Sequence, residues 1–350
     1  MIRIRAAAAC ALLTFGLGIS ACATVMQGSG EPAQIFQIAT TPIPLSSSDN
    51  HETRVGDLLY RGGVELQAND PRFGGWSGLA ISTDGKRLLS QSDDAHWLRA
   101  EPVYDKNGDL SDVNRAEMAD MNGLDGKPMI GKEGDAEGLA TISPAGPDGP
   151  VLVSFERNDR VWRYDLSHTL DAMPEPVAMP DAIHKLRMNS GLESIVLLQP
   201  HTLLAIAEDT RDANRDMIAW LVPYEGRDTG VRYGALGIVV HAPYEISDAA
   251  MSPDGKDLYL LERHYFGPIL GVVIAVRRVD VSSITAGSRV DGREIAKFTL
   301  HENIDNMEGI ALRKSSEGKL LLYMISDDNY DHLLQRTLLL MFEVSDRSVQ

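Results

Sequence analysis

Short apolar runs alternate with turn signals along most of the chain, in a phrase that recurs five times. Its clearest copy is Trp76–Asp94, where two apolar segments flank Ser82-Thr-Asp-Gly85. A second clear copy, Ile246–Arg263, is built the same way around Ser-Pro-Asp-Gly. Asp and Gly tolerate the backbone angles of a tight turn, so each copy predicts two adjacent antiparallel strands. The other copies begin at Ala136, Gly191 and Met307.

Further apolar segments follow these strand pairs and complete a larger unit. Arg160–Leu166 follows the second copy, and Gly271–Asp280 and Ile295–Leu300 follow the fourth. Corresponding positions recur about every 55–60 residues, slightly above the usual period of a propeller blade. We therefore predict an all-β protein, a β-propeller with five blades of four antiparallel strands. A β-sandwich with coincidental Asp-Gly turns agrees less well with five copies in order.

The last copy lacks a strand of its own. It offers a third strand in Thr337–Val344, after which the chain ends. We expect an N-terminal strand, Val55–Tyr60 or Gly63–Leu66, to complete this blade and hide an unpaired edge. The alternative is a six-bladed ring, in which Ile35–Leu66 would build a blade of its own.

The first residues have the pattern of an export signal. A basic start is followed by a short apolar run, Ala6–Gly18, and then by Ile19-Ser-Ala-Cys22. This resembles a bacterial lipobox, which implies cleavage before Cys22 and lipidation of its sulfur; an ordinary secretory signal is the alternative. We divide the chain into a signal peptide (1–21), a tether (22–48) and the propeller (49–350). Two or three acyl chains would anchor the protein stably in the cell envelope. By resemblance to enterobacterial lipoproteins, Ala23 after the cysteine implies the outer membrane.

Charge narrows the range of partners. The formal net charge is −17, and without Arg3 and Arg5 the remaining 31 basic and 50 acidic residues give −19. Such a surface repels nucleic acid and favours cations. The sequence also lacks the Walker, Rossmann, His-Glu-x-x-His and Gly-x-Ser-x-Gly motifs, which removes several common enzyme classes.

Two sets of polar positions recur in the repeat. In a propeller, equivalent positions of successive blades meet around the central channel. The first set lies at the start of the first strand of each copy and comprises Ser77, Glu137, Glu193, Asp248 and Glu308. Converging carboxylates suit a hard cation such as Ca²⁺, so we predict a site built from Glu137, Glu193, Asp248 and Glu308. The alternative is that each acid caps a turn within its own blade.

The second set lies at the end of the second strand. It comprises Asp93-Asp94, Glu156-Arg157, Glu208-Asp209, Glu262-Arg263-His264 and Asp327-Asp328-Asn329. The acids offer general acid or base groups, and Arg157, Arg263 and His264 offer donors to an anionic substrate such as a phosphate ester. Arg–carboxylate pairs that join neighbouring blades are the structural alternative.

Several of these motifs resemble one family. Gly74–Ala80, Asp135–Ala140, Val153–Arg157, Leu260–Arg263 and Glu308–Ala311 are similar to the phytase-like domain of bacterial exported proteins, whose label is "esterase-like activity of phytase". The resemblance spans roughly Gly56–Val344 and implies a propeller, an envelope location and hydrolysis of phosphoesters or esters. Propeller phytases hold Ca²⁺ through acidic residues. The chain departs from the pattern at Ser77 and at Leu192-Glu-Ser-Ile.

These observations predict a metal-dependent hydrolase. Glu137 or Glu308 would act as the base, and Arg157, Arg263 and His264 would hold the substrate anion. Two alternatives remain: a non-catalytic propeller that binds an envelope ligand or protein, and a lactonase-like enzyme with one central Ca²⁺, for which Asn189 and Asn306 would supply amide oxygens.

Overall fold

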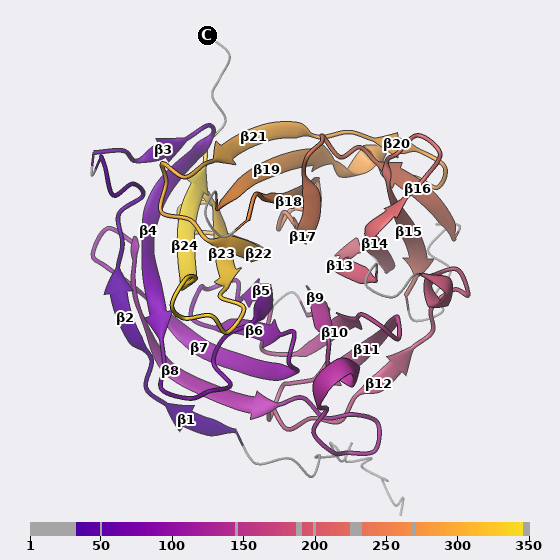
Figure 1. Ribbon diagram of the computed structural model, residues 1–350, viewed down its shortest axis with the longest axis horizontal. Coiled ribbons are helices and arrows are strands. Elements are labelled where there is room, and N and C mark those ends of the chain that lie inside the picture. The colour runs from indigo at the N-terminus through magenta and orange to yellow at the C-terminus, as the bar shows by residue number, and fades with distance from the viewer. Residues whose placement is uncertain are drawn as a thin grey trace, which may run out of the picture.

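The computed structural model confirms a five-bladed β-propeller (Figure 1). It describes residues 33–49, 51–143, 146–186, 191–198, 201–224, 233–267 and 271–345. The signal segment and Cys22 lie outside these residues, so export and lipidation stay predictions. Among the described residues, no helix is long and apolar enough to cross a bilayer.

The first three blades follow one another along the chain, each with its innermost strand first. Blade one contains β5 (Trp76–Ile81), β6 (Leu88–Ser92), β7 (His96–Tyr104) and β8 (Leu110–Asp120). Blade two contains β9 (Ala136–Thr141), β10 (Pro150–Phe155), β11 (Arg160–Asp165) and β12 (Glu175–Val177). Blade three contains β13 (Leu192–Leu198), β14 (Thr202–Arg211), β15 (Met217–Pro223), β16 (Gly234–Ile238) and a short parallel strand, β20 (Arg289–Val290).

The last two blades complete the ring. Blade four contains β17 (Glu245–Met251), β18 (Asp257–Tyr265), β19 (Val272–Asp280) and β21 (Arg293–Phe298). Blade five contains β22 (Asn306–Lys314), β23 (Leu320–Asp327), β24 (Thr337–Val344) and β4 (Leu58–Gln67). Three 3₁₀ turns lie in described connections: η1 (Gly131–Glu133), η2 (Ile183–Lys185) and η3 (Val281–Ser283).

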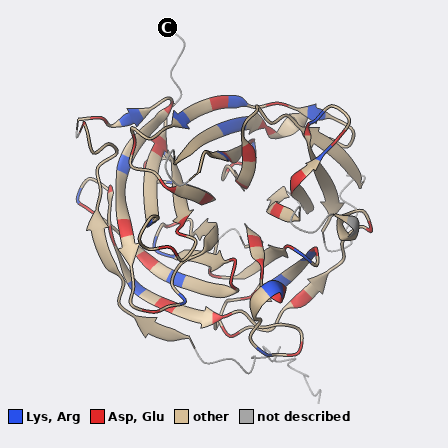
Figure 2. Ribbon diagram, in the orientation of Figure 1, with Lys and Arg blue, Asp and Glu red and all other residues tan. Residues whose placement is uncertain are grey.

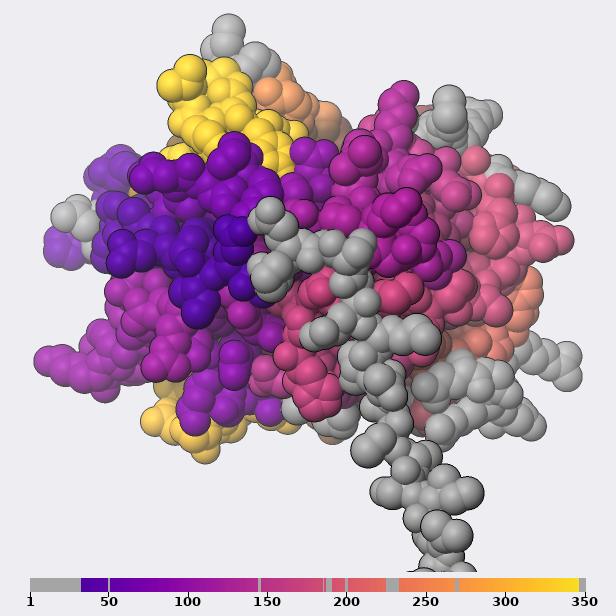
Figure 3. Space-filling view, turned by 90° about the horizontal axis from the view of Figure 1, so that it is seen from below, coloured from indigo at the N-terminus to yellow at the C-terminus, as the bar shows by residue number. Residues whose placement is uncertain are grey.

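An N-terminal strand closes the ring, as the sequence predicts. β4 pairs antiparallel with β24, from Thr337 opposite Leu66 to Val344 opposite Leu58, and contains all of Gly63–Leu66 and the second half of Val55–Tyr60. The residues before it do not form a sixth blade. β1 (Gln34–Phe36) adds to the outer edge of blade one, while β2 (Ala39–Pro42) and β3 (Arg54–Val55) pair with β4. In Figure 3, these indigo strands lie on the outer wall of the molecule.

The recurring turn has one local cause. In blade one, the Ser82 hydroxyl donates to Asp84 Oδ1 (2.7 Å), and the Gly85 amide donates to the Ser82 carbonyl (2.8 Å). Blade four repeats both bonds with Ser252, Asp254 and Gly255. Gly85 and Gly255 have φ of 76° and 71°, which favours glycine at this position. The Ser-x-Asp-Gly phrase therefore sets the turn between the first two strands of a blade.

The hydrophobic core is divided among the seams between blades. Each of five buried apolar clusters draws on two neighbouring blades, such as Trp97 of blade one and Tyr164 of blade two, whose rings meet edge-on at 5.3 Å. Alternate residues of each strand therefore pack against opposite neighbours. This arrangement fixes the distance between the innermost strands and holds their polar ends around one opening.

Candidate functional site at the channel mouth

The innermost strand of every blade carries a β-bulge near its start. In blade one, Trp76 pairs with Ser92 but Gly78 pairs with Gln91, so Ser77 is the extra residue. Register shifts fall at the corresponding point of the other four inner strands. A bulge redirects a side chain that the regular pleat would send elsewhere. The positions that the bulges align are Ser77, Glu137, Glu193, Ser247 and Glu308.

This pairing corrects the alignment of the fourth copy by one residue. Ser247, and not Asp248, occupies the bulge of β17. Asp248 shares its position with Gly78 and Gly309, where neighbouring inner strands nearly touch: a Cβ on Gly309 would lie 3.0 Å from the backbone of Gly78.

The Asp248 carboxylate instead joins three blades. It accepts hydrogen bonds from the Ser194 hydroxyl (3.0 Å), the Ala249 amide (2.7 Å) and the Ile310 amide (2.8 Å). Burial raises the pKa of Asp248 to about 8. Its oxygens are engaged within the inner strands, although the charge of Glu308, another predicted metal ligand, still acts on it.

The ends of the second strands form another ring. In each blade, one residue of the second strand directly follows the pair that precedes the bulge, and these five residues are equivalent. The pairs are Trp76–Ser92, Ala136–Phe155, Leu192–Ala207, Ile246–Glu262 and Met307–Ser326. The equivalent residues are Asp93, Glu156, Glu208, Arg263 and Asp327. Glu262 therefore lies one residue before the position that belongs to this ring. Its carboxylate is fully buried and pairs with Arg277.

The two rings together gather carboxylates around the channel mouth. We call this group the acid cluster: Asp93, Asp135, Glu137, Glu156, Glu193, Glu208, Glu308 and Asp327. In Figure 2, red segments of inner strands face one another across the centre of the ring. Below the acid cluster, all five inner strands line a cavity of about 110 Å³ with residues such as Leu79 and Ile195.

Three members of the acid cluster lie close enough to share a cation. Asp135, Glu137 and Glu156 each offer one oxygen within 4.8 Å of the other two. Glu137 was predicted from the sequence as a metal ligand, and Glu156 as part of the second set. Asp135 was missed as a ligand, although it precedes the first strand of its copy in Asp135-Ala-Glu-Gly. Glu193 and Glu308 act on Glu137 through their charges.

Burial and like charge hold protons on the acid cluster. Burial, followed by the charges of Glu308 and Asp135, raises the pKa of Glu137 well above its usual range. Burial also raises the pKa values of Glu193 and Asp327, with Glu137 and Glu308 respectively as the next cause. Burial and the neighbouring Asp135 carboxylate raise the pKa of Glu156. Burial is the first cause of all four shifts, and the like charge of neighbouring carboxylates adds to it.

Two arginines contact the acid cluster. Arg157, in a left-handed conformation (φ 63°), pairs with Asp135, and its side chain is 36% exposed. Arg263 pairs with Glu308 and donates to Asn306 Oδ1 (2.6 Å), while Asn306 Nδ2 donates to Glu308 (2.8 Å). Glu308 and Asn306 therefore hold Arg263 in place. Arg157 keeps a partly exposed guanidinium at the rim.

Two other predicted residues lie apart from this group. The His264 ring stands edge-on against Phe266 at 4.3 Å, and within the described chain no hydrogen bond or ion pair joins it to the acid cluster. Asn189 lies outside the described residues.

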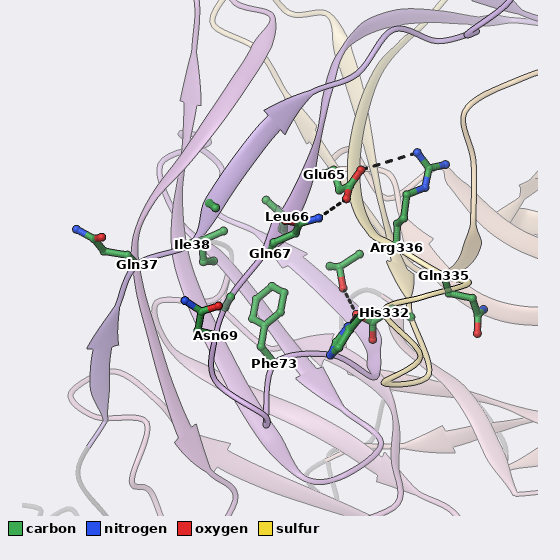
Figure 4. Close-up of a pocket in the computed structure, with 14 residues that line it drawn as sticks. Gln37, Ile38, Glu65, Leu66, Gln67, Asn69, Phe73, His332, Gln335 and Arg336 are labelled. Carbon is green, nitrogen blue, oxygen red and sulfur yellow. Dashed lines mark hydrogen bonds and ion pairs between the residues drawn. The ribbon is translucent and has the colours of Figure 1, made fainter.

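A groove of about 480 Å³ lies where blade five meets blade one (Figure 4). Beside it, buried Asp328 accepts hydrogen bonds from the amides of Gly75 (3.2 Å) and Tyr330 (3.1 Å) and from the Thr337 hydroxyl (2.9 Å). His332 Nδ1 donates to the same carboxylate (3.0 Å). Asp328, from the second predicted set, thus anchors the loop between β23 and β24.

The fold and the acid cluster define the chain as a five-bladed propeller with a carboxylate-lined channel mouth. The family model described as "Phytase-like: Esterase-like activity of phytase" matches residues 71–330, and the chain belongs to this family. A search of curated proteins found no match.

Solved structures resemble the chain only distantly. The Kuenenia stuttgartiensis hydrazine synthase matches with 12% identity and a TM-score of 0.37, over 80% of this chain and 65% of that one. This chain therefore spans just under two thirds of that protein's length. A chain of a mitotic checkpoint complex matches with 12% identity and a TM-score of 0.37, over 98% of this chain and 99% of that one.

The raised pKa values of Asp93 and Glu208 predict that the metal-free protein loses stability as pH rises. Burial is the first cause of both shifts, and each pKa lies at about 7. In the unfolded chain these carboxyls lose their protons near pH 4, so between about pH 4 and 7 the folded state holds more protons. Stability must then fall across this window and stay low above it.

Thermal unfolding in EDTA measures this effect. We expect a higher melting temperature at pH 5 than at pH 8 and a smaller difference in the Asp93→Asn/Glu208→Gln variant. Asp105→Asn is the control, because hydrogen bonds lower the pKa of this exposed hairpin residue and place its titration below the window. An equal difference in all three proteins would show that the acid cluster does not titrate in this range.

Proposed function

We propose that this protein is a metal-dependent hydrolase of phosphoesters or carboxylic esters that acts at the channel mouth. The observation that carries the proposal is the approach of Asp135, Glu137 and Glu156 within 4.8 Å, amid further carboxylates. Membership of the phytase-like family supports a hydrolytic role. Ca²⁺ is the proposed ion, because the three donors are all carboxylate oxygens and hard cations select such ligands.

The residues present fit a cation in two further respects. Carboxylates with raised pKa values gain most from a positive charge among them. Asp93 Oδ1 is also buried and makes no hydrogen bond within the described part of the chain. Asp135, Glu137 and Glu156 would hold the ion directly, and the remaining acids would raise the negative potential around it. The bound ion would polarise water or the ester oxygen.

The protein's own groups supply proton transfer and orientation. Glu137 is the proposed base: one of its oxygens would hold the ion and the other could accept a proton from water. In the metal-free protein, burial and the charges of Glu308 and Asp135 raise the pKa of Glu137 well above the usual carboxyl range. Arg157 can turn from Asp135 toward a substrate oxygen, since its guanidinium is partly exposed. Arg263 is a positioning residue, because Glu308 and Asn306 already occupy it. We assign no role to His264.

A hydrolysis panel tests the proposal. The purified protein with Ca²⁺ is expected to cleave p-nitrophenyl phosphate or p-nitrophenyl acyl esters, to lose this activity in EDTA and to regain it when Ca²⁺ is restored. Absence of turnover on every substrate with Ca²⁺ present would contradict the proposal. It would favour the alternative of a propeller that binds an envelope ligand without catalysis.

A further inference from the structure

A cavity with both polar and apolar lining residues borders the acid cluster between blades four and five. It holds about 350 Å³, and its lining includes Tyr265, Leu300 and Leu334 together with Asn306. Asn306 is also the residue that hydrogen bonds to Glu308 and Arg263 at the channel mouth. Asn306 thus belongs both to the wall of the cavity and to the polar network of the proposed active site, so the two regions adjoin.

Exposed apolar side chains gather at this cavity. Tyr265, Leu300 and Leu334 are 54%, 66% and 69% exposed. Phe266, next to Tyr265, and Leu333, next to Leu334, are also exposed. Five of the nine exposed large apolar residues of the described chain therefore lie at or beside this cavity. Single exposed apolar residues are common on soluble proteins, whereas several around a concave surface are typical of ligand-binding sites.

The local backbone holds these side chains at the cavity. Leu300 lies directly over Gly271, where a Cβ would approach Leu300 Cδ2 to 2.4 Å and where φ is +68°. The loop that carries Leu334 is tied by the bond from the Leu334 amide to the Asp331 carbonyl (3.0 Å) and by the contacts of Asp328. The apolar lining is therefore positioned by hydrogen bonds and close packing, without entering the core.

The charges around the cavity exclude a polyanionic ligand. Glu302, Asp305 and Asp331 line it together with a single cation, Arg336, whose Nε lies 3.7 Å from Asp305. The acid cluster adds further negative charge beside it. Every additional phosphate on a ligand would be repelled in this field, whereas an uncharged ester with an apolar chain meets no such repulsion.

We propose that this cavity binds the apolar acyl chain of a carboxylic ester whose ester group lies at the acid cluster. The inference rests on the proposed function and names its substrate class. In the reaction, water oxygen bonds to the acyl carbon, the bond to the alcohol oxygen breaks, and one water proton passes to the departing alcohol. The products are a carboxylic acid and an alcohol, and no oxidant or reductant is needed.

Chain-length dependence tests this inference with p-nitrophenyl acetate, butyrate and octanoate in Ca²⁺. We expect kcat/KM to rise with acyl length and to exceed the value for inositol hexakisphosphate. In Leu300→Ser/Leu334→Ser, the ratio of octanoate to acetate kcat/KM should fall about tenfold, since an apolar pocket discriminates by such factors. Leu333→Ser is the matched control, because Leu333 is 95% exposed and does not line the cavity.

A binding measurement separates this inference from the proposed function. The ligand is 4-nitrophenyl hexyl ether, which cannot be hydrolysed, and melting temperatures check that the variants fold. Binding that weakens in Leu300→Ser/Leu334→Ser but not in Leu333→Ser supports the cavity even if no ester is cleaved. Ester hydrolysis that is independent of chain length, with equal ratios in all three proteins, overturns the inference and leaves the proposed function standing.

Discussion

The Glu137→Gln/Glu156→Gln variant is expected to bind Ca²⁺ on the order of a hundredfold more weakly and to lose ester hydrolysis to a similar extent. Both substitutions keep the size of the side chain and remove one charge each from the three carboxylates that lie within 4.8 Å of one another. Isothermal titration with Ca²⁺ and the initial rate of ester hydrolysis measure the two losses.

The stability of the metal-free variant gives a sharper result. Because burial and like charge raise the pKa values of Glu137 and Glu156, their ionised forms oppose folding. The variant should therefore melt at a higher temperature than the parent in EDTA at pH 8, and gain less from added Ca²⁺. Carboxylates that merely capped turns within their own blades would give the reverse, a lower melting temperature in EDTA.

A matched pair of substitutions controls for net charge. Glu175→Gln/Glu317→Gln removes the same two charges from side chains that are each 73% exposed. This protein should bind Ca²⁺ and hydrolyse esters like the parent. If the control loses affinity as much as the variant, the effect comes from the overall negative field and not from a site.

The sequence predicts the blades well because their signals are local. The Ser82–Gly85 and Ser252–Gly255 turns carry their own hydrogen bonds and glycine conformations, so each can be recognised without knowledge of the rest. Ring closure by β4 also follows, since the edge of the third strand of the fifth copy, Thr337–Val344, needs a partner.

The site was harder to predict because it depends on strand register. A bulge position is set by pairing between two strands, and a slip of one residue sends a side chain to the other face. Aligning acid with acid placed Asp248 in the ring, although Ser247 occupies the bulge. The second strand of blade four shows the same one-residue error: Arg263, and not Glu262, is equivalent to Asp93 and Glu156. The cavity between blades four and five gave no sequence signal at all, since Tyr265 ends β18 while Leu300 and Leu334 lie in two separate connections.

Replacing Glu262 alone by leucine is expected to lower the free energy of unfolding by about 3–5 kcal/mol, because it leaves a buried arginine with only the more distant and partly exposed Glu294 (3.7 Å) as an anionic partner. Glu262 is fully buried and Arg277 is 4% exposed. Arg277 Nε donates to Glu262 Oε1 at 3.1 Å and Nη2 donates to Oε2 at 3.1 Å, while Nη1 donates to the Gly292 carbonyl at 2.9 Å. Urea denaturation of the parent and the variant measures the difference.

The double variant Glu262→Leu/Arg277→Leu should recover most of this loss. Burial raises the pKa of Glu262 even though Arg277 acts in the opposite direction, so for the Glu262 carboxylate the cost of leaving water exceeds the gain from Arg277. The exposed pair Lys86–Asp84 is the reference: Asp84→Asn, which can keep the turn hydrogen bonds, should change stability by less than about 1 kcal/mol. A double variant as unstable as the single one would show that the ion pair itself, and not the unpaired charge, determines the stability of blade four.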